Sequence, residues 1–203
     1  MAEFVLGGIL QLYKESKFFA ENQAAHRWEK HRGLRELSGK TACIIGTGSV
    51  GSAIARRLRA FDVQTVGINR SGHPAAEFDQ TQPTCRLDDL LPLADLVSCA
   101  MPLTAETAGL FDSVRLAKIK PGAVFVNVAR GKVTDQQALV EALQSGQLSG
   151  AVLDVFEEEP LPRSSPLWDM EQVILTPHNS FVGEHNGERL FRLFCKNLES
   201  FAQ

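Results

Sequence analysis

The feature that most restricts the fold of this chain is a glycine-rich turn between two patterned segments. Residues 41–45 form an apolar run that predicts a buried strand, and residues 52–60 carry apolar positions on one helical face. Between them Gly46, Gly48 and Gly51 have the G-x-G-x-x-G spacing. In a strand–turn–helix unit such glycines permit a tight turn, a close phosphate and close helix packing, so the segment predicts a dinucleotide-binding turn.

Similar apolar runs recur along the chain with helical patterns between several of them. They cover residues 63–68, 96–100, 123–128, 151–155 and 173–175. Strands that alternate with helices predict an α/β fold, a doubly wound parallel sheet of the Rossmann type. The pattern at 135–144 predicts a helix whose end is bracketed by Gly146 and Gly150, and Pro121-Gly122 is expected to stop the helix before the strand at 123.

Composition narrows the class of ligand. With 203 residues and 44% hydrophobic content, the chain can bury one substantial core. A net charge of -3 gives no field that would attract nucleic acid or an anionic membrane, so we expect a small-molecule ligand, and the cluster 56–59 is interpreted as a solvated helix face. The four cysteines lack metal-site spacing, and neither a leader nor a bilayer-length apolar run is evident. We therefore expect a soluble, cytoplasmic protein without a metal site.

The first forty residues do not follow the strand–helix alternation. Residues 4–13 are apolar on nearly every side, which is typical of a helix buried against a partner or a second domain. An exposed apolar helix would in any case be an association surface. The chain is expected to begin inside a larger structure.

The residues after the second predicted strand bear on the choice of cofactor. An acidic residue at this position would accept hydrogen bonds from the adenosine ribose, but the sequence has Asn69, Arg70 and Ser71. Without a carboxylate there is no repulsion of a 2′-phosphate, and Arg70 with Ser71 can donate hydrogen bonds to one. This pattern favours NADP over NAD. The alternative is that Arg70 stacks on the adenine or points into solvent, which leaves the choice open.

Three residues with catalytic chemistry follow three later strands. Arg130, Glu159 and His178 come after the runs ending near 128, 155 and 175, so the carboxyl edge of a parallel sheet should bring them together. A guanidinium binds a carboxylate through two hydrogen bonds, and a His/Glu pair transfers a proton. Taken singly, Arg130 could cap a helix, Glu159 could belong to a solvated acidic run, and His178 could be a turn residue beside Pro177.

With these motifs in place, the chain resembles the D-isomer-specific 2-hydroxyacid dehydrogenases over essentially its whole length. The resemblance is carried by residues 46–51, 101–107, 127–131, 153–156, 159–160 and 176–178. It implies that Arg130 binds the carboxylate of a small 2-keto or 2-hydroxy acid, that His178 exchanges a proton with its oxygen, and that Glu159 orients and charges His178. It implies cofactor contacts from Gly46, Gly48, Ser49, Val50, Gly51, Asn69, Arg70, Ser71, Met101, Pro102, Leu103, Thr107, Val128, Ala129 and Asp154, with Asp154 and the backbone of 128–129 at the nicotinamide amide.

The resemblance also implies an organisation. Residues 1–38 are expected to form a connecting helix and dimerisation arm, 39–182 the dinucleotide-binding domain, and 183–203 a return helix. Most of the family's substrate domain is then absent, turnover by this chain is in doubt, and a homodimer is expected. An alternative is a noncatalytic NAD(P)-sensing interaction module, as in the family's corepressor relatives. Which acid is used, and with which cofactor, is not fixed by the sequence.

Overall fold

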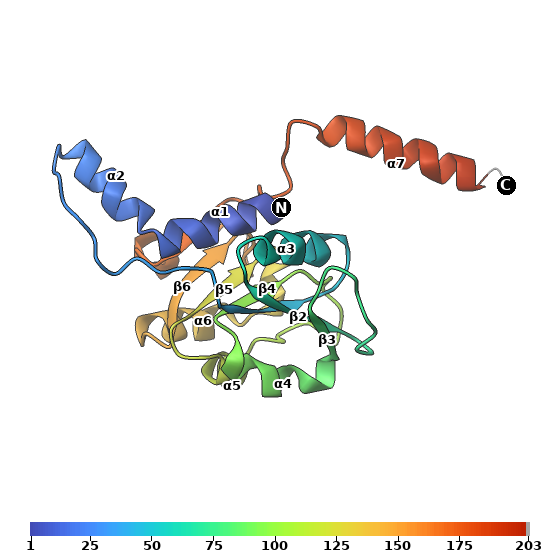
Figure 1. The fold of residues 1–203 in the computed structure, drawn as a ribbon, viewed down its shortest axis with the longest axis horizontal. Coiled ribbons are helices and arrows are strands. Elements are labelled where there is room, and N and C mark those ends of the chain that lie inside the picture. Colours follow the sequence, from blue (N-terminus) through green and yellow to red (C-terminus); the bar gives the residue numbers. More distant parts are fainter. Residues whose placement is uncertain (202–203) are drawn as a thin grey trace.

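A single parallel sheet organises the chain. The computed structural model describes residues 1–201, in which seven strands lie in the order β3-β2-β1-β4-β5-β6-β7 with every pairing parallel (Figure 1). The strands are β1 (Thr41–Ile45), β2 (Gln64–Asn69), β3 (Gln80–Pro83), β4 (Leu96–Cys99), β5 (Ala123–Asn127), β6 (Leu148–Leu153) and β7 (Val173–Leu175). The chain reverses its direction across the sheet between β1 and β4, and ligands of this architecture bind at that point, outside the carboxyl ends of the strands. The predicted doubly wound parallel sheet is confirmed.

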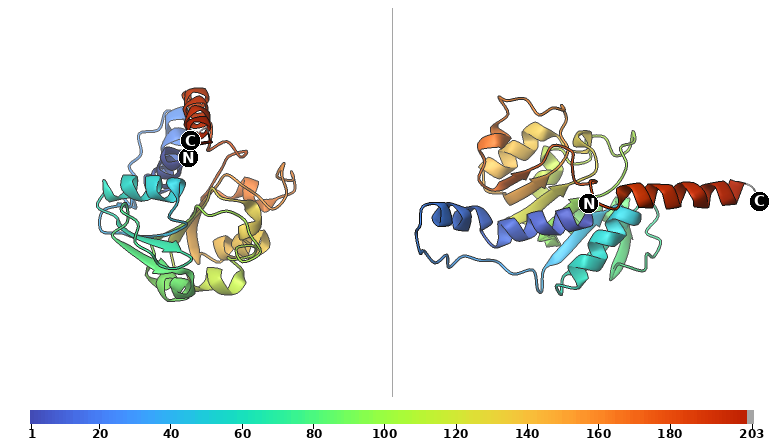
Figure 2. Two further views of the ribbon diagram at one scale, coloured as in Figure 1. Left: turned by 90° about the vertical axis from the view of Figure 1, so that its right-hand side faces the viewer. Right: turned by 90° about the horizontal axis from the view of Figure 1, so that it is seen from above.

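Helices cover both faces of the sheet (Figure 2). The α-helices are α1 (Ala2–Tyr13), α2 (Ser16–Ala24), α3 (Ser49–Arg59), α4 (Leu87–Leu90), α5 (Ser113–Lys118), α6 (Gln136–Gln144) and α7 (Asn186–Phe201), with short 3-10 turns at Thr84–Arg86, Leu91–Leu93, Gly131–Val133 and Pro166–Asp169. Helices α1 and α3 pack on one face, where Ala42 and Ile44 of β1 point, and α4, α5 and α6 pack on the other with Cys43 and Ile45. Strand β1 is buried on both faces, which explains its unbroken apolar run.

Several boundaries differ from the sequence predictions. Helix α3 begins at Ser49 rather than at residue 52, and β6 begins at Leu148 rather than at 151. Gly150 therefore lies inside a strand, and the expectation that it brackets the end of α6 is wrong. A Cβ atom at Gly150 would lie 2.8 Å from the carbonyl oxygen of Gln172, so the glycine permits close backbone approach. Gly146, with φ +76°, does follow α6 in the left-handed conformation.

Helix α1 packs on the sheet of its own chain. Val5, Ile9 and Leu12 are buried in the same cluster as β6 residue Val152. The approach is close, because a Cβ atom at Gly8 would lie 2.5 Å from Cγ1 of Val152. The expectation that this helix is buried against a partner or second domain is thus wrong for its Val5–Ile9–Leu12 stripe. Since the crossover helix between β5 and β6 lies on the opposite face, this face of β6 is free to accept α1.

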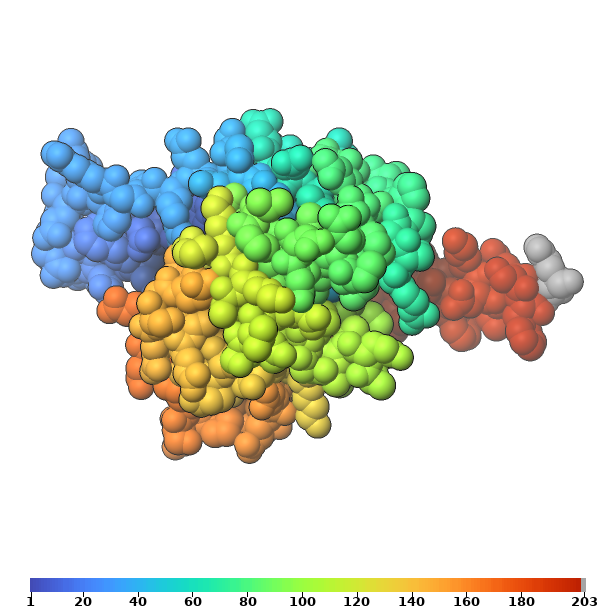
Figure 3. Space-filling model, turned by 90° about the horizontal axis from the view of Figure 1, so that it is seen from below, coloured from blue at the N-terminus to red at the C-terminus, as the bar shows by residue number. Residues whose placement is uncertain are grey.

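Two helices project from the body of the molecule. Helix α2 extends at one end and α7 at the other (Figures 1 and 3). Along residues 186–201 no side chain of α7 is buried, although the helix carries a row of large apolar residues. The remaining residues of the expected return helix, 202–203, lie outside the described residues. None of the helices in residues 1–201 has both the length and the apolarity that a membrane span requires.

Candidate active site

The glycine turn after β1 is built by two close backbone approaches. Gly46 has φ +104° and donates its N–H to the carbonyl oxygen of Ile68 at 2.8 Å. A Cβ atom at Gly46 would lie 2.6 Å from the carbonyl oxygen of Ala100, and one at Gly51 would lie 1.8 Å from that of Gly46. Side chains at these two positions would force β1, β4 and α3 apart, so both glycines are required by packing.

Gly48 differs from its two neighbours because it faces open space. It is the N-cap of α3, and a Cβ atom there would meet nothing within 4 Å. Ser49 and Val50 are the first residues of the helix, and the N–H groups of a first turn have no intrahelical acceptors. The open cradle at Gly48 and the positive end of α3 fit a dinucleotide phosphate, which a backbone without Cβ can approach closely.

The turn that follows β2 is fastened by Asn69. Its Nδ2 atom donates to Oγ1 of Thr47 at 3.2 Å and to the carbonyl oxygen of His73 at 2.9 Å, while its Oδ1 accepts the N–H of Gly72 at 2.7 Å. The side chains of Arg70 and Ser71 are exposed. The three residues expected to face the ribose therefore differ: Asn69 fixes the turn and connects it to the glycine loop, whereas Arg70 and Ser71 are open to a ligand.

The segment after β4 is held by Thr107. Its hydroxyl donates to the carbonyl oxygen of Pro102 at 2.8 Å and accepts the N–H of Thr104 at 2.7 Å. Met101 is buried, while Pro102 and Leu103 are exposed. Pro102 and Leu103 thus present surface beside the glycine turn, and Thr107 shapes the loop that carries them.

Asp154, directly after β6, is buried and bonds the loop after β7. Its Oδ1 accepts hydrogen bonds from Oγ1 of Thr176 at 2.6 Å and from the N–H of Asn179 at 2.7 Å, and its Oδ2 accepts the N–H of Ser180 at 3.0 Å. The resemblance implies that this carboxylate contacts the nicotinamide amide, and in the structure it also bonds residues 176–180. Val128 and Ala129 are buried after β5, and the N–H of Ala129 donates to Oδ1 of Asn127 at 3.0 Å.

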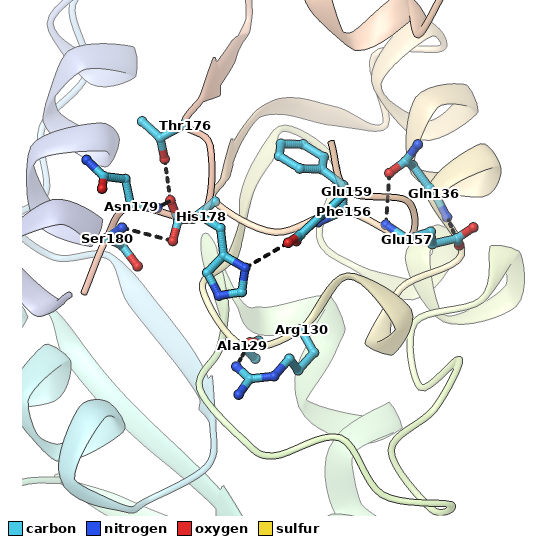
Figure 4. A network of polar contacts seen from close by, with 11 residues as sticks. Ala129, Arg130, Gln136, Phe156, Glu157, Glu159, Thr176, His178, Asn179 and Ser180 are labelled. Carbon is cyan, nitrogen blue, oxygen red and sulfur yellow. Dashed lines mark hydrogen bonds and ion pairs between the residues drawn. The ribbon is translucent and has the colours of Figure 1, made fainter. Parts of the chain in front are cut away.

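His178 and Glu159 form a bonded pair. The Nδ1 atom of His178 lies 2.8 Å from Oε2 of Glu159, whose Oε1 accepts the N–H of Phe156 at 3.0 Å (Figure 4). His178 has φ 51°, and its N–H donates to the carbonyl oxygen of Asp154 at 2.8 Å. Partial burial raises the pKa of Glu159, but the hydrogen bonds from His178 and Phe156 outweigh it, so this pKa lies below its ordinary value. Glu159 is therefore a carboxylate at neutral pH.

Arg130 lies beside this pair because the loops after β5 and β6 touch. A Cβ atom at Gly131 would lie 1.8 Å from the carbonyl oxygen of Phe156, which only a glycine allows. The Nη1 atom of Arg130 donates to the carbonyl oxygen of Ala129 at 2.6 Å, and the rest of the exposed guanidinium remains open. In Figure 4 the guanidinium of Arg130 and the imidazole of His178 face the same open space.

A mostly apolar depression of about 620 Å³ adjoins the His/Glu pair. Sequence reasoning did not identify it, because its walls come from separate loops. Its walls are formed by Phe156, Glu159, Pro160, Leu161, Trp168, Leu175, Thr176, Pro177 and His178. In the part of the chain that the structure describes, no three His, Cys, Asp or Glu side chains are grouped so that they could hold a metal ion.

The fold and this arrangement define a Rossmann-type dinucleotide-binding domain with an exposed arginine and a bonded His/Glu pair at its carboxyl edge. Residues 6–180 match the model of the D-isomer specific 2-hydroxyacid dehydrogenase family, NAD binding domain. The chain belongs to that family.

Individual relatives agree with this assignment. A glyoxylate reductase of Thermofilum pendens is 38% identical over 98% of this chain and 60% of its own length. A family member of Aeromonas salmonicida has a TM-score of 0.91 at 38% identity, over 99% of this chain and 64% of that one. A probable 2-hydroxyacid dehydrogenase of Rhizobium etli, solved with NADP, HEPES and L(+)-tartaric acid, has a TM-score of 0.88 at 31% identity and the same coverage. The chain thus spans less than two thirds of each relative.

Proposed function

We propose that this chain is the cofactor-binding part of an NAD(P)H-dependent reductase of small 2-keto acids, with glyoxylate and hydroxypyruvate as the first substrates to test. The bound nicotinamide nucleotide would supply the hydride. The observation that carries the proposal is the 2.8 Å contact between Nδ1 of His178 and Oε2 of Glu159, on the edge where Arg130 presents an open guanidinium. The glyoxylate reductase activity named for the Thermofilum pendens relative is consistent with this chemistry.

Each residue has a distinct task in this proposal. Arg130 binds the substrate carboxylate through two parallel hydrogen bonds and so orients the neighbouring carbonyl. The carboxylate of Glu159 stabilises the charged imidazole of His178, which donates its proton from Nε2 to the oxygen that becomes a hydroxyl. Asp154 fixes the backbone of the loop that carries His178.

For the cofactor, we propose that Gly46, Gly48, Ser49, Val50 and Gly51 hold the phosphates and that Arg70 and Ser71 favour NADP over NAD. Met101, Pro102 and Leu103 would cover the adenosine, with Thr107 holding their loop. Val128 and Ala129 would flank the nicotinamide, with Asp154 at its amide. We also propose the division into 1–38, 39–182 and 183–203, and a homodimer that forms through one of the two projecting elements, the N-terminal arm or α7.

The test follows nucleotide binding and keto-acid binding separately. The chain is titrated with NADPH and NADH by fluorescence, and glyoxylate or hydroxypyruvate is then added to the loaded protein. We expect NADPH to bind, keto acid to quench its fluorescence, and Arg130→Met to abolish only the second step. Any oxidation of NADPH should fall at least about 100-fold in Glu159→Gln and in His178→Asn.

Two results would contradict the proposal in different ways. Failure to bind either nucleotide would exclude the cofactor assignment. Nucleotide binding without any keto-acid binding would favour the alternative, a noncatalytic NAD(P)-sensing module.

A further inference from the structure

The turn after β2 carries a third polar side chain next to Arg70 and Ser71. The Nδ1 atom of His73 lies 3.0 Å from Oγ of Ser71, and both side chains are exposed. Sequence reasoning stopped at Ser71, because the spacing alone does not indicate that the chain folds back and brings residue 73 beside it.

This turn is rigidly held. Besides the bonds of Asn69, the hydroxyl of Thr81 donates to the carbonyl oxygen of Gly72 at 3.2 Å. Gly72 has φ +76°, and a Cβ atom there would lie 2.7 Å from Cδ of Pro83 on β3. The backbone of residues 69–73 is thus held against β3 and against the glycine loop, so the positions from which its side chains project are set before a ligand binds.

The turn and the loop after β4 both adjoin the glycine loop. Nδ2 of Asn69 donates to Oγ1 of Thr47 at 3.2 Å, and a Cβ atom at Gly46 would lie 2.6 Å from the carbonyl oxygen of Ala100 at the end of β4. Glu106 is engaged by Oγ1 of Thr104 at 2.7 Å. The turn that carries Arg70 and the residues proposed to cover the adenosine therefore lie next to the same glycine loop.

We propose that His73 is a further determinant of cofactor specificity, donating a hydrogen bond from Nε2 to the 2′-phosphate of NADP beside Arg70 and Ser71. This inference rests on the NADP preference proposed above. With Nδ1 accepting the Ser71 hydroxyl, the neutral imidazole carries its proton on Nε2, which points away from the pair. In this arrangement the single hydroxyl proton of Ser71 goes to Nδ1, so Ser71 orients the imidazole ring, and Arg70 and His73 donate to the phosphate. Asn69 acts as a positioning residue that holds the turn.

The test uses two fragments that differ only in the phosphate at issue: adenosine 2′,5′-bisphosphate and adenosine 5′-monophosphate. Their dissociation constants are measured by calorimetry for the unchanged chain and for His73→Ala. We expect the unchanged chain to bind the bisphosphate more tightly than the monophosphate. His73→Ala should raise the dissociation constant of the bisphosphate about tenfold, as loss of a hydrogen bond to a charged group predicts. Binding of the monophosphate should change less than about twofold.

A matched variant separates this effect from the general loss of an imidazole. His26 follows α2, a helix that lies away from β2 and β3 (Figure 1), and it has φ 53°, which asparagine tolerates. His26→Asn should alter neither dissociation constant. Equal binding of both fragments by the unchanged chain would overturn the NADP preference itself. Discrimination that persists undiminished in His73→Ala would overturn only the role of His73.

Discussion

At the scale of single residues, the carboxylate of Asp154 holds the loop on which His178 lies. It is 1% exposed and accepts three hydrogen bonds from residues 176–180. In Asp154→Asn one oxygen becomes an amide NH2, which confronts a backbone N–H and leaves it without an acceptor. We expect the free energy of unfolding to fall by about 2–4 kcal/mol, measured by urea denaturation.

Asp135 offers a matched control for this substitution. It is the N-cap of α6 and accepts a single hydrogen bond, from the N–H of Ala138 at 2.9 Å. Asparagine caps helices about as well as aspartate, so Asp135→Asn should change the free energy of unfolding by less than about 0.5 kcal/mol. Equal losses for the two variants would show that the three bonds of Asp154 give no special stability.

Residue chemistry also determines how much of the site could be predicted. Arg130, Glu159 and His178 could be selected from the sequence because each follows an apolar run that ends at the same edge of a parallel sheet. The partners of Asp154 could not, since two of them are backbone N–H groups, which every non-proline residue carries. His73 was missed for a related reason: its contact with Ser71 depends on the turn that Asn69 and Gly72 impose.

At the scale of elements, the strand–turn–helix unit predicts opposite results for two of its glycines. Gly51→Ala would set a methyl group 1.8 Å from the carbonyl oxygen of Gly46, so we expect a loss of stability of several kcal/mol, of the order found for overpacked cores or more. Gly48→Ala meets nothing within 4 Å and has φ -74°, so the free energy of unfolding should fall by less than about 1 kcal/mol, the cost of alanine at an N-cap. The added methyl group would occupy the proposed phosphate cradle, and NADPH affinity should fall at least about tenfold.

Thermal unfolding and fluorescence titration of both variants check this prediction. If Gly48→Ala binds NADPH as well as the unchanged chain, the phosphate does not lie over this residue. If Gly51→Ala unfolds like the unchanged chain, the close approach of α3 to the turn is not required.

Asp95 connects β4 to β1 and should make stability depend on pH. It accepts the N–H of Thr41 at 3.0 Å and a hydrogen bond from Nζ of Lys120 at 2.7 Å. Burial raises its pKa, but these bonds outweigh it, so the folded pKa lies below the ordinary 3.8. A depressed carboxylate pKa stabilises the fold above the ordinary value, and this contribution is lost as pH falls through the folded value.

Asp95→Asn removes this carboxylate and should therefore lower the free energy of unfolding only at pH values at which the carboxylate of the unchanged chain is charged. At pH 7 we expect the free energy of unfolding to fall by about 1–3 kcal/mol. Well below pH 3.8 the difference from the unchanged chain should largely disappear. Urea denaturation at several pH values measures both quantities, and a difference that is independent of pH would contradict the argument.

At the scale of the whole molecule, periodicity predicted the parallel sheet, because buried strands of such sheets read as apolar runs. It missed β3, whose sequence Gln-Thr-Gln-Pro is polar. That strand lies at the edge of the sheet and pairs only with β2, so it needs no apolar run. Periodicity also could not locate α1, since the pattern of a helix that is apolar on nearly every side does not indicate which surface covers it.

The sequence of helix α7 likewise does not indicate which surface covers its apolar residues, and an experiment can identify that surface. Phe191 and Phe194 are 67% and 58% exposed on a helix without buried residues in the described range 186–201. Clustered exposed apolar side chains are association surfaces, so we expect the chain to self-associate at micromolar concentration. Changing both phenylalanines to lysine should raise the dissociation constant of self-association about 100-fold or more, because burying each phenylalanine side chain contributes about 1.5–3 kcal/mol.

Sedimentation equilibrium of the double variant measures this change, with Lys196→Gln, on the opposite face of α7, as the control that should leave association unchanged. Unfolding and NADPH binding should also stay unchanged in the double variant, since no described side chain of α7 is buried in the body of the molecule. Association that persists in the double variant would instead place the contact on the other projecting element, α2 and the residues that follow it. There Trp28 is 96% exposed. The experiment therefore decides which of the two projecting elements joins the chains.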